Sequence, residues 1–310
     1  MNRDILRVRP SEIVRWWVFT QERFEPISHF VMILFFVAAH WVAVSKTERL
    51  DVSVFRVLPV LVGSIAFFFK LRLFDEIKDY EHDIRFNPSR PLARGLLQVP
   101  EVKFAIIFCI FLELICFGSY GLVPLATISF SILYSILMYH EFFIGTWLRP
   151  RLTLYAVTHT LVSVFLSSSI LTALTARSTL SHAPETLKLC ASSWFLFNVF
   201  EFGRKTFATI EERSDVPSYS KIFTPNGAVV LVLSQTLIAS WLLAWNNAIT
   251  AYLLLTGITL AALGATYAAQ NRKETAKFFR MASSAYIVLV YLGIITCLSG
   301  YLSGGLNVSQ

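Results

Sequence analysis

Long apolar segments alternate with short polar segments over almost the whole chain. Nine apolar runs are long enough to cross about 30 Å of hydrocarbon as helices. They cover residues 27–45, 52–74, 102–119, 121–140, 152–175, 187–205, 226–245, 247–268 and 281–303. Because backbone polar groups in a bilayer have to be satisfied internally, this pattern predicts an all-α integral membrane protein. We expect a bundle of about nine transmembrane helices around a central, lipid-accessible cavity.

The ends of the chain differ from this central part. Residues 1–26 are too charged and interrupted for a secretory signal, and their apolar positions lie among arginines. A helix on the membrane surface has this composition, with tryptophans at headgroup depth. We therefore predict an interfacial N-terminal segment over 1–26, a transmembrane domain over 27–303 and a short C-terminal tail over 304–310. The apolar residues concerned are Ile5, Leu6, Ile13, Val14, Trp16 and Trp17.

Composition agrees with a membrane location. Of the 310 residues 55% are hydrophobic and 15% are charged, whereas a soluble protein carries about 25% charged residues. The four cysteines lie inside apolar runs without the spacing of a zinc site. The net charge of +7 in such a chain reports orientation. We expect the lipid bilayer as a partner and no nucleic acid.

The basic residues are distributed unequally between the two sides of the predicted bundle. The side that holds the N-terminus and the loops after the second, fourth, sixth and eighth helices carries 22 of the 27 Lys and Arg residues. Such an asymmetry marks the cytoplasmic side. The two long polar loops, about 75–101 and 206–225, are then both cytoplasmic and able to close over one pocket.

A cluster of acids follows the second apolar run. Asp75, Asp79 and Asp83 are spaced i, i+4, i+8, and Glu76 joins Asp79 and Asp83 at i, i+3, i+7. Continued as a helix, these carboxylates share one face and repel one another. A divalent cation removes that repulsion, and sparse carboxylate ligation completed by water and phosphate is typical of Mg²⁺. The alternative is a solvated acidic loop balanced by Lys78, Arg85, Arg90 and Arg94.

The segment D-E-x-x-D-x-x-x-D (75–83), followed by S-R-P-L-A-R-G (89–95), resembles the first aspartate-rich motif of the UbiA superfamily of intramembrane prenyltransferases. The resemblance covers roughly residues 20–303. In that family the motif commonly begins N-D, where this chain has Asp75 and Glu76. The resemblance implies that Asp75, Glu76, Asp79 and Asp83 hold Mg²⁺ against the diphosphate of a polyprenyl donor.

The second motif of the family is altered here. A second D-x-x-x-D set usually ends the sixth helix, whereas this chain has Glu201 followed by Arg204 and Lys205. Glu201 is able to replace the first acid as a metal ligand. Arg204 and Lys205 are able to bind diphosphate oxygens directly, as fixed cations in place of a second metal. The alternative is that both are positive-inside anchors.

These residues suggest a reaction at the cytoplasmic mouth of the bundle. The donor diphosphate departs with help from Mg²⁺ and nearby cations, and a hydrophobic or aromatic acceptor captures the allylic cation in an aromatic cavity that excludes water. Asp79, Arg204 and Lys205 are the predicted catalytic residues. The predicted substrate contacts are Arg72, Lys78, Arg90, Arg94, Tyr219 and Lys221.

Three other functions fit parts of the pattern. A membrane terpene cyclase of the same superfamily uses the same donor chemistry without an acceptor. A divalent-cation or metabolite transporter is less consistent, because transport sites usually lie near the bilayer midplane. A scaffold without activity needs no such spacing of acids.

Few polar residues lie within the apolar runs. Glu113 is an intramembrane acid, which suggests function by default, although a hydrogen bond between helices explains it more simply. Lys70 lies near the end of its run and is expected to reach the interface or line a cavity. The others are His40, His159 and Asn198.

Overall fold

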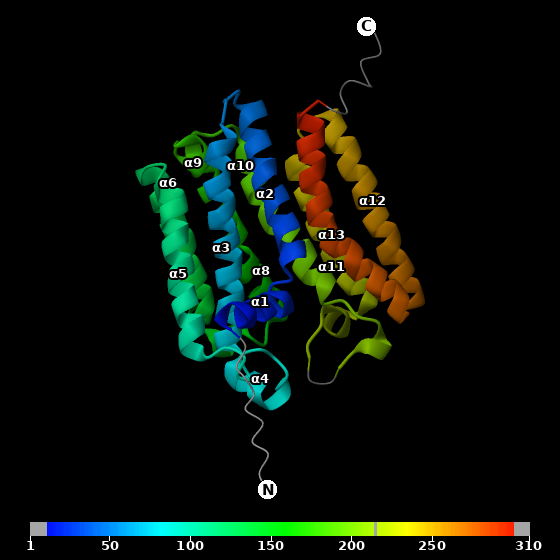
Figure 1. The fold of residues 1–310 in the computed structure, drawn as a ribbon. Coiled ribbons are helices and arrows are strands. Elements are labelled where there is room, and N and C mark those ends of the chain that lie inside the picture. Colours follow the sequence, from blue (N-terminus) through cyan, green and yellow to red (C-terminus); the bar gives the residue numbers. More distant parts are fainter. Residues whose placement is uncertain (1–10, 214–215, 301–310) are drawn as a thin grey trace.

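The computed structural model describes residues 11–213 and 216–300, and nine long helices within these ranges run side by side (Figure 1). They are α2 (Pro26–Thr47), α3 (Val54–Lys78), α5 (Val99–Gly118), α6 (Leu122–Tyr139), the nearly continuous pair α8 (Leu152–Thr160) and α9 (Val162–Thr175), α10 (Pro184–Arg204), α11 (Tyr219–Leu243), α12 (Asn247–Gln270) and α13 (Lys273–Leu298). The short helices are α1 (Glu12–Arg23), α4 (Tyr80–Phe86), α7 (Gly145–Leu148) and the 3-10 turns η1 (Glu141–Phe143), η2 (Thr179–Ser181) and η3 (Thr209–Glu211).

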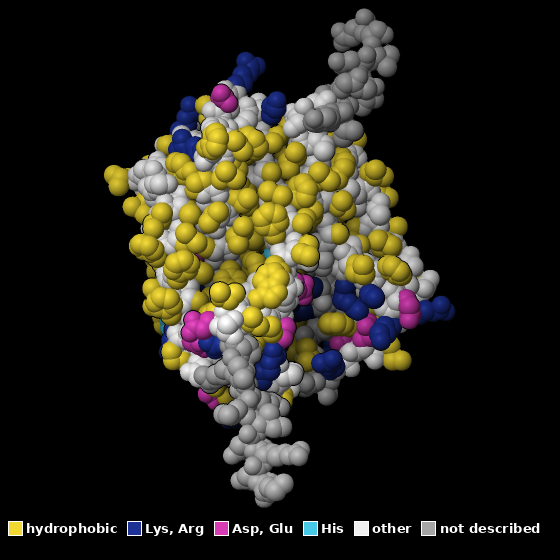
Figure 2. All heavy atoms as spheres, viewed as in Figure 1, with side chains coloured by type: hydrophobic (Ala, Val, Ile, Leu, Met, Phe, Trp, Pro, Cys, Tyr) yellow, Lys and Arg dark blue, Asp and Glu magenta, His cyan; other side chains and the backbone are white. Residues whose placement is uncertain are grey.

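The all-α membrane architecture predicted from the sequence is confirmed, with each apolar run forming a long helix. By length and apolar composition, seven of the described helices are able to cross a membrane. Two further helices, α5 and α10, carry charged residues along their length and pack among the other seven. Side chains form an apolar belt between two charged rims in Figure 2. Two cavities of the described residues lie at the rims, beside Glu211 and beside Asp51, and the central cavity stays a prediction.

Local sequence signals set the helix ends. Ser53 and Asn246 accept backbone hydrogen bonds at the starts of α3 and α12, which satisfies N–H groups that a helix leaves unpaired. Pro26 and Pro184 occupy the first helical positions of α2 and α10, where the missing N–H is not needed. The α3 helix runs to Lys78, so the first acids of the 75–83 cluster are helical.

The α10 helix lies at the centre of the bundle and packs against α2, α8, α9, α11 and α13. Its last turn approaches α13 closely at Gly203, where an added Cβ would overlap the Ser283 side chain. Small residues of this kind allow membrane helices to approach closely. The end of α10, with Glu201 and Arg204, is therefore fixed relative to α13.

The charged end of the bundle, defined here as the end with α1, α4 and residues 205–218, carries both long polar loops (Figure 1). The α1 helix crosses this end and is held there by three ion pairs: Arg15–Glu101, Glu22–Arg94 and Arg23–Glu76. It buries Phe19 and leaves Ile13 and Trp17 exposed. The interfacial role of residues 1–26 stays a prediction, and Ile5, Leu6 and the 304–310 tail lie outside the described residues.

Within the bundle, Lys70 corrects one expectation. It does not reach the interface: its side chain is fully buried, and its Nζ lies 2.6 Å from Glu113 Oε2 on α5. The predicted role of Glu113 in linking helices is thereby confirmed, with an ion pair in place of a neutral hydrogen bond.

Candidate active site at the charged end of the bundle

The first acidic motif lies where α3 passes into α4. Asp79 caps α3 with a helical backbone and precedes α4 directly, and Asp83 N–H donates to the Asp79 carbonyl at 2.8 Å. The acids nevertheless divide into two pairs. Asp75 and Asp79 are partly exposed, at 43% and 46% of their side chains. Glu76 and Asp83 are buried, at 1% and 4%.

Asp75 and Asp79 lie within a group of cations. Arg72 Nη1 and Lys78 Nζ lie 3.5 and 3.6 Å from the Asp75 carboxylate, and Arg90 Nη1 lies 3.9 Å from Asp79. Partial burial, followed by repulsion from Asp75, raises the pKa of Asp79 above its ordinary value. The two acids thus repel each other at a wet surface, as expected for carboxylates that share a ligand.

Glu76 and Asp83 have other partners. One Glu76 oxygen pairs with Arg23 of α1, and the other is buried without a hydrogen-bond partner among the described residues. Asp83 accepts from Arg90 Nη1 at 2.7 Å and from Asn87 Nδ2 at 3.0 Å. The four acids predicted to share one face therefore form two groups: the partly exposed Asp75 and Asp79, and the buried Glu76 and Asp83.

The altered second motif forms a compact ion cluster at the end of α10. Glu201 accepts from Arg204 Nε at 2.5 Å and lies 2.8 Å from Lys205 Nζ. Its carboxylate is therefore matched by two cations from its own helix end. A role for Glu201 as a metal ligand requires one of these pairs to open, and stays a prediction.

The two motifs lie at the same charged end of the bundle and interact electrostatically. Arg204 interacts electrostatically with Asp75, and Arg72 interacts with both. Each of the carboxylates Asp75 and Glu201 is paired with two cations. This arrangement leaves a local excess of positive charge that an anion with several negative charges is able to neutralise.

Three of the predicted substrate contacts have structural partners. Arg94 makes a two-bond ion pair with Glu22 of α1. Tyr219 is fully buried against Phe202, and its hydroxyl lies 3.5 Å from the Leu152 carbonyl. Lys221 donates to the Arg213 carbonyl at 3.0 Å. Tyr219 also interacts electrostatically with Glu201 and Arg204 of the second motif, and the roles of all three side chains in binding stay predictions.

The α8 helix and the segment before it add residues that the two sequence motifs do not include. Arg149 interacts electrostatically with Asp79, while its Nε donates to Glu141 Oε2 at 2.6 Å. Tyr155 accepts from Lys78 Nζ at 2.7 Å and stacks on His159 at 3.9 Å between ring centroids. One pattern in the sequence points to these residues: Tyr155 and His159 are spaced by one helical turn.

The carboxylates of this site meet the requirements of Mg²⁺ only in part. No group of three His, Cys, Asp or Glu side chains within residues 11–213 and 216–300 is placed to hold a metal ion. Mg²⁺ often takes only one or two carboxylates and completes its shell with water and phosphate. Asp75 and Asp79 fit that mode, because both are partly exposed and repel each other. Glu76 does not fit, because it is buried and paired with Arg23.

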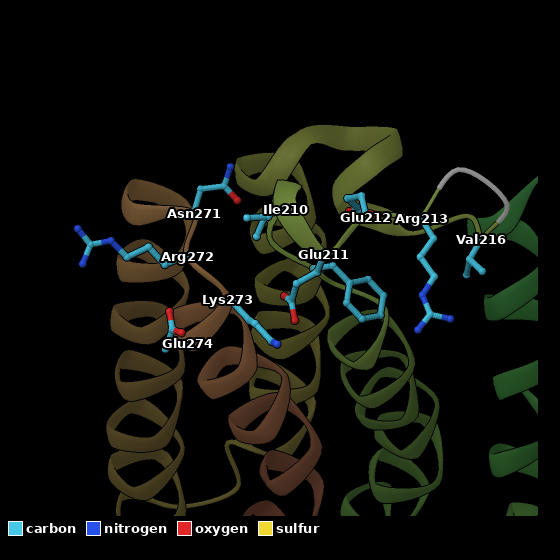
Figure 3. A pocket seen from close by; sticks show the side chains of 10 residues that line it. Ile210, Glu211, Glu212, Arg213, Val216, Asn271, Arg272, Lys273 and Glu274 are labelled. Atoms are coloured by element: carbon cyan, nitrogen blue, oxygen red, sulfur yellow. The ribbon is translucent and has the colours of Figure 1, made fainter.

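A separate cavity of about 960 Å³ is lined by Phe207, Ile210–Arg213 and Val216 on one side and by the turn from α12 to α13 on the other (Figure 3). Glu211 and Lys273 extend into it from opposite segments. Arg280 holds Glu211 by two hydrogen bonds at 2.9 and 3.0 Å. The described lining contains none of the residues predicted to bind donor or metal, so this cavity is distinct from the Asp75–Arg204 site.

Fold and site together define a membrane-embedded helical bundle with a charged mouth made from the ends of α3 and α10. Two solved structures share this architecture. A structure of digeranylgeranylglyceryl phosphate synthase aligns over 92% of this chain and 99% of its own, with a TM-score of 0.59 and 16% identity. A UbiA homolog from Aeropyrum pernix K1 aligns over 87% and 98%, with a TM-score of 0.61 and 14% identity.

The chain therefore has the fold of the UbiA-type membrane proteins, as its first motif suggested. The likeness extends over nearly the whole length of both structures. No protein-family model and no curated protein matches the sequence. The fold is thus shared, although the sequence has diverged far from these structures.

Proposed function

We propose that this protein is a UbiA-type intramembrane prenyltransferase. In this proposal it moves a polyprenyl group from an isoprenoid diphosphate to a hydrophobic acceptor and releases pyrophosphate. The observation that carries the proposal is that Asp75, paired with Arg72 and Lys78 at the end of α3, and Arg204, paired with Glu201 at the end of α10, lie within electrostatic range at the mouth of a UbiA-type bundle. A diphosphate needs both metal-binding carboxylates and direct cations, and these residues supply them.

The cations act on the leaving group. Arg72 and Lys78 pair with Asp75, Arg204 acts on it electrostatically, and each of the three cations is able to donate hydrogen bonds to diphosphate oxygens. As the carbon–oxygen bond of the donor breaks, negative charge grows on the pyrophosphate. Fixed cations that already face that position stabilise the developing charge without reorganisation.

Asp75 and Asp79 are the residues of this chain that would hold Mg²⁺. The metal, when bound, neutralises part of the diphosphate charge. Partial burial and then repulsion from Asp75 raise the pKa of Asp79, and a cation relieves that repulsion. Arg90 lies beside Asp79 and Asp83 and keeps this acidic segment in position.

The apolar belt accounts for the rest of the reaction. The polyprenyl tail is insoluble in water and remains among the helices or in lipid. Aromatic side chains line the bundle close to the site, including Phe68 stacked on Phe197 with ring centroids 5.6 Å apart. Ring faces are able to stabilise a cation, and a dry interior protects it from water.

The direct test is product analysis with the purified protein in lipid. Farnesyl and geranylgeranyl diphosphate are supplied with Mg²⁺, with and without aromatic and aliphatic acceptors. We expect pyrophosphate release and a prenylated product that requires the acceptor. Release of a cyclic hydrocarbon or alcohol without acceptor would instead identify a terpene cyclase.

A matched pair of variants links the reaction to the site. We expect Arg72→Gln to weaken binding of a non-hydrolysable geranylgeranyl thiodiphosphate by about tenfold, as for one lost charged hydrogen bond. The control is Lys103→Gln, an exposed cation on α5. Equal affinities for both variants and the wild type would contradict the proposed diphosphate site.

A further inference from the structure

Two buried polar atoms on the α8–α9 helix pair have no hydrogen-bond partner among the described residues: His159 Nε2 and Ser163 Oγ. An unpaired polar atom in an apolar interior is unfavourable, since it loses its bond to water without replacement. The two residues are four positions apart on a nearly continuous helix, so they lie on one face. Two unpaired polar atoms on one face of the helix pair offer hydrogen-bonding positions for a polar ligand.

The hydrogen bonds of His159 determine what that ligand has to offer. Its Nδ1 lies 2.7 Å from the Tyr155 carbonyl oxygen, which only accepts, so Nδ1 carries the proton. In the neutral ring Nε2 is then a bare acceptor. The ligand therefore donates a hydrogen bond to Nε2.

The position of His159 connects it to the diphosphate site. Its ring stacks on Tyr155, whose hydroxyl is held by Lys78, which in turn lies 3.6 Å from Asp75. His159 also interacts electrostatically with Asp75. Contacts through Tyr155 and Lys78 thus link the His159 ring to Asp75, one of the carboxylates that would hold the donor headgroup. An acceptor bound beside this ring would lie on the membrane side of the donor headgroup.

We propose that His159 and Ser163 bind the hydroxyl group of the acceptor, and that His159 removes its proton. The hydroxyl donates to His159 Nε2 and accepts from Ser163 Oγ, which satisfies both unpaired atoms. This inference rests on the proposed function and specifies its acceptor as a hydrophobic alcohol or phenol.

The chemical step is balanced by these groups. The bond between the first prenyl carbon and the diphosphate oxygen breaks, and its electron pair leaves with pyrophosphate. The acceptor hydroxyl oxygen forms the new bond to that carbon. Its proton passes to Nε2, so His159 becomes an imidazolium until product leaves. A general base of this kind contributes about 10²–10⁴ in rate.

A strained turn covers the site. Phe142 packs edge-on against His159, with 5.9 Å between ring centroids. Glu141, Phe142 and Phe143 all have left-handed φ values, of 49°, 53° and 58°, a conformation that disfavours side chains larger than glycine. In this proposal, Phe142 moves away from the His159 ring when the acceptor enters.

The test compares acceptors that differ only in the hydroxyl hydrogen. 2-Naphthol and hexadecanol are assayed with their methyl ethers, for the wild type, His159→Phe, His159→Gln and Ser163→Ala. Phenylalanine keeps the stacking on Tyr155 but accepts no hydrogen bond, whereas glutamine keeps an acceptor oxygen. Ser192→Ala is the control, since that buried hydroxyl already donates to the Leu189 carbonyl.

We expect His159→Phe to lower kcat/KM for the hydroxyl acceptors by at least 10²-fold, with partial recovery in His159→Gln. Ser163→Ala should lower it by about tenfold, the loss of one hydrogen bond, and Ser192→Ala should leave it unchanged. Binding of geranylgeranyl thiodiphosphate should change by less than twofold in every variant. This second readout also reports correct folding.

Two results would overturn the inference and leave the proposed function intact. One is a kcat/KM for hydroxyl acceptors that is the same in His159→Phe and Ser163→Ala as in the wild type. The other is loss of donor binding in parallel with loss of transfer, which would assign these residues a structural role. Failure of the wild type to bind the thiodiphosphate would instead contradict the proposed function itself.

Discussion

The buried ion pair between Lys70 and Glu113 allows a quantitative prediction about the bundle. Both side chains are fully buried, 2.6 Å apart, and Glu113 Oε1 has no further partner among the described residues. Lys70→Met leaves the carboxylate without any hydrogen bond. Removal of one member of a buried pair costs about 3–5 kcal/mol, and a charge at the centre of a membrane helix about 2.5–3.5 kcal/mol. We therefore expect a loss of about 3 kcal/mol.

The reverse substitution should be less harmful. In Glu113→Leu the Lys70 ammonium keeps the Phe67 ring, whose centroid is 4.2 Å away. A desolvated cation–π contact contributes about 2 kcal/mol, so we expect a loss of about 1–2 kcal/mol. The double variant should recover most of the stability, because two apolar residues often replace a buried pair without loss.

The assay is reversible unfolding in mixed micelles by titration with sodium dodecyl sulfate, followed by tryptophan fluorescence. The four proteins of the cycle give the coupling energy between Lys70 and Glu113 directly. Equal losses for the two single variants would refute the role assigned to Phe67. A double variant as unstable as the sum of the singles would refute the pairing itself.

Three further predictions use the same unfolding assay. Arg23→Gln leaves the buried Glu76 unpaired and should cost about 3 kcal/mol, whereas Glu22→Gln breaks a more exposed pair and should cost under about 1 kcal/mol; equal losses would contradict this. Gly203→Ala adds a Cβ against Ser283 and should lower the free energy of unfolding by about 1–3 kcal/mol. An unchanged free energy of unfolding would show that α10 is able to shift away from α13 at this point. The Arg280 hydrogen bonds lower the pKa of Glu211 below 4.5, so the stability lost in Arg280→Met should be full above pH 4.5 and should shrink as pH falls below it; a constant difference down to pH 3 would contradict the pairing.

The sequence predicted the helices well because membrane crossing imposes a simple requirement on each segment. Twenty apolar residues with backbone bonds satisfied internally leave few alternatives to a helix. The charge asymmetry also placed both polar loops at one end, where Figure 1 has them. The helix ends were less predictable, because α3 extends through Asp75 to Lys78 and α13 begins at Lys273.

The residue types of the site were predictable from the sequence, whereas the ion-pair partners of those residues were less so. Helical spacing predicted that Asp75, Glu76, Asp79 and Asp83 share one face. Spacing reflects only the positions of residues along a single helix. Glu76 instead pairs with Arg23, which is 53 residues earlier in the chain. Contacts between distant segments depend on the packing of α1 across the bundle, and local periodicity carries no information on that packing. Tyr155 and Arg149 were missed for the same reason.

The most direct test of the proposed function is pyrophosphate release from geranylgeranyl diphosphate by Asp79→Asn. This variant keeps the size of the side chain at a half-exposed position and removes the charge. The matched control is Glu81→Gln, an exposed acid of the same segment. We predict that Asp79→Asn folds as the wild type does and loses release by at least 10²-fold, while Glu81→Gln retains it. Release at the wild-type rate from Asp79→Asn would contradict the assignment of this site.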